Sequence, residues 1–150
     1  MSLIKRIGFL TAFIIPGLTI IGFYLGGYWN FSALIFVFVL IPFADFIIGE
    51  DPDNMDDAQA AILSGKFYYR LITYVWTFFQ VAFLFWGAYV IAVSSMEPIF
   101  WIVFVFSFAL VTGGIGITVA HELGHKKSKL ERIYGRIILM TVCYMHFYIE

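Results

Sequence analysis

Two histidines and a glutamate stand close together in the segment "HELGH", which follows an apolar stretch and precedes a run of basic residues. His121 and His125 are four residues apart, and on an α-helix such residues lie on one face, where both imidazoles reach a single metal ion. Two imidazoles suit zinc, iron, copper or nickel, so the spacing alone does not choose the metal. The alternative is a pair of histidines that only solvates a helix end. The glutamate between them makes metal binding the stronger hypothesis.

The position of Glu122 allows more than one role. In zinc proteases with the His-Glu-x-x-His signature, the glutamate is the general base toward a zinc-bound water. Glu122 lies about 100° around a helix from His121, so it can also orient a histidine, bind the metal or face water. Site-two-type intramembrane proteases carry the same letters inside the membrane, and a zinc intramembrane protease is the alternative function. Its weak point is that basic residues follow at once and place the motif at the membrane surface: Lys126, Lys127, Lys129, Arg132 and Arg136.

The composition predicts an all-α integral membrane protein. Of the 150 residues, 62% are hydrophobic and only 13% are charged, whereas about 25% of the residues of a soluble domain are charged. So small a polar fraction does not cover that much apolar surface in water. The basic residues form no face interleaved with aromatic residues, which argues against nucleic-acid binding. The apolar segments carry almost no polar groups, which argues against a metal transporter, the non-enzymatic alternative.

Four segments approach or exceed the roughly 20 apolar residues that a membrane-spanning helix needs. We predict spans at about 7–25, 31–48, 71–93 and 99–120, arranged as two hairpins within a single domain of residues 1–150. A fifth apolar run, "IILMTVCYMHFYI", is thirteen residues long and covers only about 20 Å as a helix. It predicts an interfacial or re-entrant helix, or the beginning of a truncated span. The chain therefore resembles the N-terminal part of a longer enzyme.

The lysines and arginines predict the orientation of the spans. All nine fall on one side of the four-span arrangement, and the two short turns, 26–30 and 94–98, contain none. Cytoplasmic loops of membrane proteins carry the excess of basic residues. The N-terminus and the histidine cluster are therefore expected to face the cytoplasm.

The segments around the histidines resemble the membrane alkane 1-monooxygenase (alkane hydroxylase) family. "HELGHKK" and the following "ERIYGRIILMTVCYMHFYIE" carry the resemblance, together with "IPFADFIIGED" (Ile41 to Asp51) and "FYYRLITY" (Phe67 to Tyr74) upstream. It covers essentially the entire chain, and a protease has no reason to carry these flanking segments. The resemblance implies a non-haem diiron enzyme of the bacterial inner (cytoplasmic) membrane, distantly related to membrane fatty acid desaturases and hydroxylases.

The same resemblance implies the roles of particular residues. His121 and His125 match the first histidine cluster and would be iron ligands, and Glu150 matches the glutamate that opens the next cluster. His146, four residues before Glu150, is a candidate for supporting a ligand. The later clusters that complete a two-iron site are absent from these 150 residues. The implied reaction inserts one oxygen atom of O₂ into a terminal C–H bond of an alkane, with electrons from rubredoxin and its NAD(P)H-dependent reductase.

Overall fold

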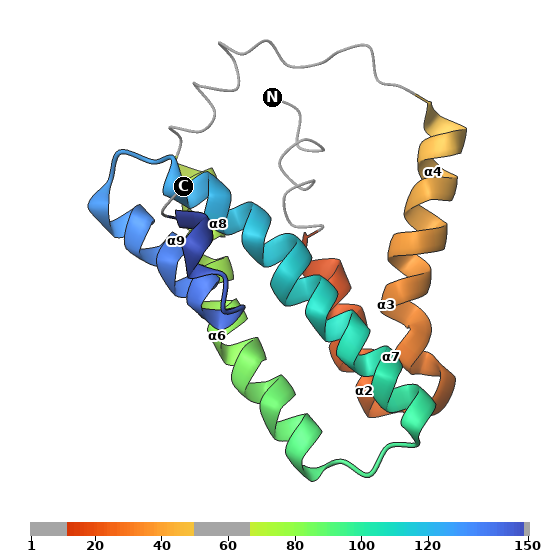
Figure 1. Ribbon diagram of the computed structural model, residues 1–150. Helices are drawn as coiled ribbons and strands as arrows, with labels where there is room; N and C mark the ends of the chain where they lie inside the picture. Colours follow the sequence, from red (N-terminus) through yellow and green to blue (C-terminus); the bar gives the residue numbers. More distant parts are fainter. Residues whose placement is uncertain (1–11, 50–66, 149–150) are drawn as a thin grey trace. The chain divides into compact units, whose positions relative to one another are not determined.

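The computed structural model describes residues 12–49 and 67–148, and every regular element in these two ranges is a helix (Figure 1). The predicted all-α class is therefore confirmed for the described residues. The start of the predicted first span, residues 50–66 between the second and third predicted spans, and Glu150 lie outside them. The chain divides into two compact units, one formed by Met1–Arg70 and Glu97–Ser107, the other by Leu71–Met96 and Phe108–Glu150.

The first unit begins with α2, Ile14–Leu25, and a tight turn that leads into the second predicted span. Gly26 and Gly27 have φ angles of 72° and 53°, a left-handed conformation that favours glycine. The turn continues as the short 3₁₀ helix η2 and packs so closely on α2 that a Cβ on Gly22 would meet the Trp29 carbonyl oxygen. The helical elements that follow are η2 (Gly27–Phe31), α3 (Ser32–Ile35), the π-helical η3 (Phe36–Leu40) and α4 (Ile41–Ile48).

Pro42 explains why a π-turn interrupts this helix. A proline inside an α-helix lacks the N–H for the bond to residue i−4, and its ring clashes with that carbonyl. The wider turn of η3 ends at Leu40, two residues before Pro42, and lets the helix continue through the proline. The candidate span formed in this way runs from Gly27 to Ile47.

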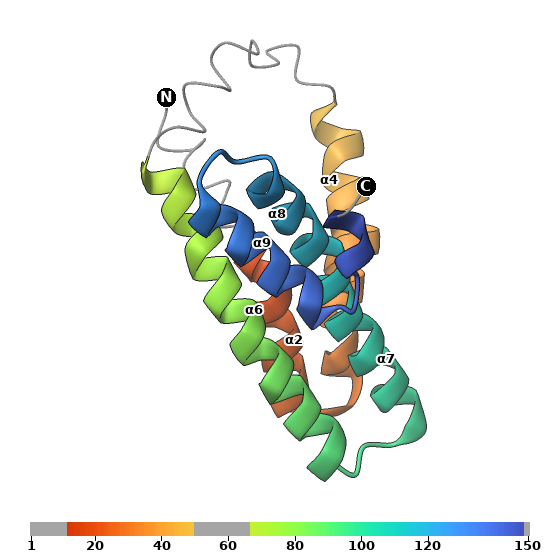
Figure 2. The same ribbon diagram turned by 60° about the vertical axis from the view of Figure 1, so that its left-hand side comes forward.

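The second unit contains most of α6, the end of α7 and the elements that carry the histidines. α6 is a single helix of 27 residues, whereas a π-helical segment, η4, separates α7 from α8. The helices are α6 (Phe67–Val93), α7 (Pro98–Ala109), η4 (Leu110–Ile115), α8 (Gly116–Gly124), α9 (Lys129–Thr141) and the 3₁₀ helix η5 (Met145–Tyr148). α9 lies alongside α8 in both views (Figures 1 and 2).

Three helices of the described ranges are long and apolar enough to cross a membrane. They cover Gly27–Ile47, Arg70–Val93 and Pro98–Gly124, close to the second, third and fourth predicted spans. Of the first predicted span the structure describes residues 12–25, within which α2 has 12 residues and is shorter than a span. The protein is therefore an all-α membrane protein, and the predicted number of four spans stays a prediction.

The predicted interfacial, re-entrant or truncated helix over the fifth apolar run is not confirmed as a single element. α9 begins at Lys129, ahead of that run, and ends at Thr141. The chain then turns through Cys143, whose φ is 55°, and forms η5. Cys143 in this left-handed conformation ends the helix, and the Tyr144 N–H after it donates back to the Leu139 carbonyl at 2.9 Å. The apolar run is thus divided between two elements.

Candidate metal site

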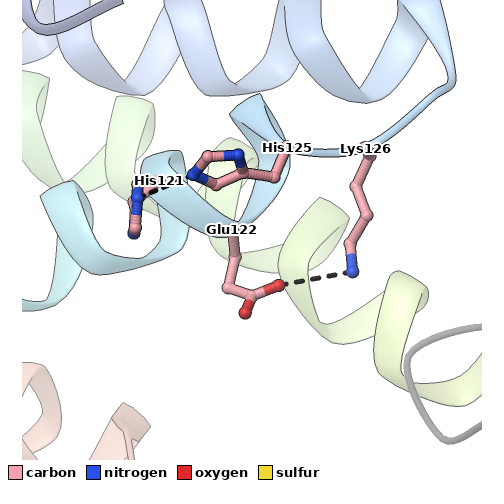
Figure 3. A network of polar contacts seen from close by, with 4 residues as sticks. All are labelled: His121, Glu122, His125 and Lys126. Atoms are coloured by element: carbon pink, nitrogen blue, oxygen red, sulfur yellow. Dashed lines mark hydrogen bonds and ion pairs between the residues drawn. The ribbon is translucent and has the colours of Figure 1, made fainter. Parts of the chain in front are cut away.

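The two histidines of the motif meet at the C-terminal end of α8. His121 lies in the last turn, and His125 caps the helix through a backbone N–H that donates to the His121 carbonyl at 3.3 Å. Their Nε2 atoms are 2.8 Å apart, and the ring centroids are 4.5 Å apart with an interplanar angle of 78° (Figure 3). Both side chains are exposed. The expectation that the two imidazoles share one helix face is confirmed.

The donor set and its spacing fit a metal ion. Two nitrogen ligands about 2.1 Å from one ion and at right angles to each other are about 3 Å apart. The 2.8 Å separation of the two Nε2 atoms is close to that value. When one ring carries its proton on Nε2 and the other does not, the same contact is a hydrogen bond. Within the described residues no group of three or more histidine, cysteine, aspartate or glutamate side chains is placed to hold a metal. His121 and His125 could therefore hold a metal only together with further ligands, and their assignment as metal ligands stays a prediction.

Glu122 does not join the imidazole pair. Its carboxylate points toward Lys126, whose Nζ lies 3.3 Å from Oε2, and Figure 3 shows it directed away from the two rings. The Glu122 side chain is 66% exposed. An exposed ion pair of this i, i+4 kind contributes about 0.5 kcal/mol or less to helix stability. In this arrangement Glu122 is an exposed group paired with Lys126, and its predicted role at the metal stays a prediction.

α9 and η5 support the histidines from one side. A Cβ on Gly135 of α9 would lie 3.0 Å from the Ala120 carbonyl oxygen and 3.2 Å from Leu123 Cβ, so the two helices are in close contact. This contact and the turn after α9 bring Phe147 back to His121, with ring centroids 5.7 Å apart and an edge-to-face geometry. Aromatic contacts of this kind hold a ring in a preferred orientation.

The other two candidate residues are not part of this arrangement. His146 is exposed, and its ring lies against Tyr144 at a centroid distance of 4.3 Å. Glu150 is outside the described residues. Their assignment as supporting residues or as the start of a further ligand cluster stays a prediction.

The sequence analysis missed a buried polar network on α6. Gln80 is completely buried, accepts a hydrogen bond from Trp76 Nε1 at 2.8 Å, and donates through Nε2 to the Thr112 carbonyl at 3.2 Å and to Thr141 Oγ1 at 2.8 Å. The expectation that the spans carry almost no polar groups overlooked this residue. The available signal was an amide side chain inside a long apolar helix, one turn after Thr77, because a polar group in such a helix usually has a role.

Comparison with known proteins identifies the family. No family model matches the chain. It is 38% identical over 125 residues to "Alkane 1-monooxygenase 1" of Pseudomonas aeruginosa, covering 82% of this chain and 33% of that protein. It is 33% identical to "Alkane 1-monooxygenase 2" of Alcanivorax borkumensis, covering 82% and 32%, and 31% identical to the "Alkane 1-monooxygenase" of Pseudomonas putida, covering 90% and 35%. The chain belongs to the alkane 1-monooxygenase family.

Family membership confirms the resemblance drawn from the sequence. The match covers only part of the length of the relatives. The chain spans about a third of the length of the three relatives. Neither these relatives nor the geometry of the described residues favours the zinc-protease alternative, whose general base would be the glutamate that pairs with Lys126.

Proposed function

We propose that this chain supplies two iron ligands, His121 and His125, to a membrane alkane 1-monooxygenase with two non-haem irons. The observation that carries the proposal is the imidazole pair, 2.8 Å apart at the end of an apolar helix, in a chain related to alkane 1-monooxygenases. The reaction takes an alkane, O₂, two electrons and two protons, and yields a primary alcohol and water. The remaining ligands come from outside the described residues, and Glu150 is one candidate.

The surroundings of the pair suit this chemistry. Bound iron would supply the activation of O₂, for which histidine-rich ligation is suited because it leaves open positions on the metal. His121 and His125 bind and orient, and Phe147 restrains the His121 ring by its edge-to-face contact. An alkane partitions into lipid and arrives through the apolar helices, whereas electrons and protons arrive from water. A site at the end of a spanning helix is accessible to both.

The proposal includes the orientation and the redox partner. The basic residues that follow α8 favour the cytoplasmic side of a bacterial inner membrane. Rubredoxin, reduced by an NAD(P)H-dependent reductase, is the proposed source of electrons. The same basic segment is suited to contact with anionic lipid or with an acidic redox protein.

The metal distinguishes this proposal from the zinc-protease alternative. The full-length gene product, purified in detergent and stripped with a chelator, is expected to regain alkane-dependent O₂ consumption after addition of Fe(II) and not after addition of Zn(II). The measurement is O₂ uptake with an octane-type substrate, together with gas chromatography of the alcohol. Cleavage of a peptide substrate restored by Zn(II), with no alcohol formed after Fe(II), would establish the protease instead.

Replacing Glu122 by glutamine is expected to leave iron content and hydroxylation within about twofold of the wild type. The reason is that the carboxylate is exposed and pairs with Lys126, and the loss of such a pair changes stability by less than about 1 kcal/mol. Iron content per protein and the turnover rate are measured on the same preparation. A loss of activity by a factor of a hundred with normal iron content would assign Glu122 a catalytic proton transfer.

A further inference from the structure

The π-helical segment η4 lies between two contacts that fix the helix against α6. On one side of it, the Phe108 ring stacks on Phe83 at a centroid distance of 4.9 Å and fills the space beside Gly87, where a Cβ would overlap the ring. On the other side, Gly116 packs on the Gln80 amide, and a Cβ there would overlap it as well. Both contacts belong to the second unit.

The π-turn brings these two contacts closer to one line along the helix. Phe108 and Gly116 are eight residues apart, which on a regular α-helix places them about 80° from each other around the axis. A single π-turn contains about one residue more than a turn of α-helix. With that residue accommodated, the angle between Phe108 and Gly116 around the helix axis is about 20°, in the opposite direction. With η4 in place, Phe108 and Gly116 lie nearly in line along the side of the helix that contacts α6. The backbone shows the wider turn directly, since the Gly116 N–H donates to the Val111 carbonyl five residues before it.

The Gln80 side chain is fixed in the orientation that contacts this turn. Trp76 Nε1 is only a donor, so the Gln80 oxygen must face it, and Nε2 must then face the Thr112 carbonyl within η4. Thr112 adds a second contact at the same place, because its hydroxyl donates to the Phe108 carbonyl at 3.0 Å. Nε2 of Gln80 also donates to Thr141 at the end of α9. One side chain thus joins α6 to the π-turn before the histidines and to the helix packed beside them.

We propose that Gln80 is a positioning residue for the metal site, which holds η4 in its π-helical form and thereby sets the face on which α8 presents His121 and His125. If η4 relaxed to a regular α-helix, α8 would rotate by about 100° relative to Phe108. The imidazoles would leave the face next to α9 and Phe147. This inference rests on the proposed iron site. It adds to that site a positioning residue that lies about 40 residues before the ligands in the sequence.

The test compares Gln80→Met, which keeps the size and removes the hydrogen bonds, with Thr77→Val. Thr77 is also buried on α6, and its hydroxyl bonds only to the Thr73 carbonyl of its own helix. Both variants are made in the full-length protein. Iron affinity of Gln80→Met is expected to fall by about tenfold to a hundredfold, as for other residues that orient ligands, while Thr77→Val stays close to wild type. Hydrogen exchange of residues 110–124 in metal-free protein is expected to accelerate only in Gln80→Met.

A third variant separates positioning from general stability. The variant lacks one residue of the Gly113–Gly114 pair, where a Cβ at either position would meet no neighbouring atom within 4 Å. This deletion is expected to turn η4 into an α-helix without rotating α8. Combined with Gln80→Met, this deletion is expected to restore iron affinity to within a few-fold of wild type. The combination also serves as the test if Gln80→Met alone does not fold.

The outcomes decide the proposal in either direction. Failure of the deletion to restore iron affinity, or equal losses in Gln80→Met and Thr77→Val, would overturn the positioning role. Unchanged exchange and iron affinity in Gln80→Met would overturn it as well. If the wild-type protein bound no iron at the histidines, the proposed function would fail separately, and the exchange data on metal-free protein would still decide whether Gln80 holds the π-turn.

Discussion

Replacing His125 by alanine in the full-length protein is expected to remove most of the bound iron and to abolish alkane hydroxylation, and His121→Ala is expected to do the same. The two Nε2 atoms are 2.8 Å apart and form the only imidazole pair in the described residues, so neither histidine has a neighbour able to replace it. Loss of an outer partner of a ligand lowers metal affinity by about 10- to 100-fold, and loss of a ligand itself is expected to cost more.

The matched control for these variants is His146→Ala. His146 is also exposed and close in sequence, but its ring contacts Tyr144. His146→Ala is expected to retain most of its iron because this ring packs on Tyr144, and a loss of iron in this variant would instead support the predicted role of His146 beside a ligand. Iron is measured by mass spectrometry on monodisperse protein, and hydroxylation by the yield of primary alcohol. Normal iron content in both His121→Ala and His125→Ala would contradict the assignment of the two ligands.

The second large effect is expected from Gly116→Ala. The added Cβ would overlap the Gln80 amide, and that amide is held at both ends by hydrogen bonds, so it cannot move aside without breaking one of them. Overpacking of this kind destabilises a protein by about 1–3 kcal/mol. The expected result is a lower midpoint of thermal unfolding, accompanied by a lower iron affinity because the contact that orients α8 is disturbed.

Gly114→Ala provides the comparison. Gly114 belongs to the same helix, is exposed, and a Cβ on it would meet no atom within 4 Å. Alanine has a better helix propensity than glycine by about 1 kcal/mol, so this change is expected to be neutral or stabilising. If the two substitutions shifted the unfolding midpoint equally, the close contact between Gly116 and Gln80 would not be a determinant of stability.

The membrane-spanning helices could be predicted from features that are visible in the sequence itself. Length and apolar composition were enough to locate three of the long helices to within a few residues, and the glycines at 26 and 27 marked the turn that they form. The end of α9 could not be read in the same way, because it lies at a left-handed Cys143 rather than at the glycine that usually marks such an end. The composition of the last apolar run favoured one helix, whereas the turn at Cys143 divides the run.

In the candidate site, too, local features could be predicted from the sequence and contacts between distant residues could not. The i, i+4 spacing placed His121 and His125 on one face, since that relation is local to one helix. The partner of Glu122 is also local, but an i, i+4 lysine was not weighed against a role at the metal. Gln80 was missed because its hydrogen bonds reach residues 32 and 61 positions away, and no local pattern indicates which helices meet.

The most direct test of the central claim is turnover of the full-length, iron-loaded protein under ¹⁸O₂ with a linear alkane and a reducing system. We expect a primary alcohol that carries one ¹⁸O atom from O₂, formed by the wild type and not by His125→Ala. Alcohol labelled from water instead of O₂, or equal labelled product from His125→Ala, would contradict it.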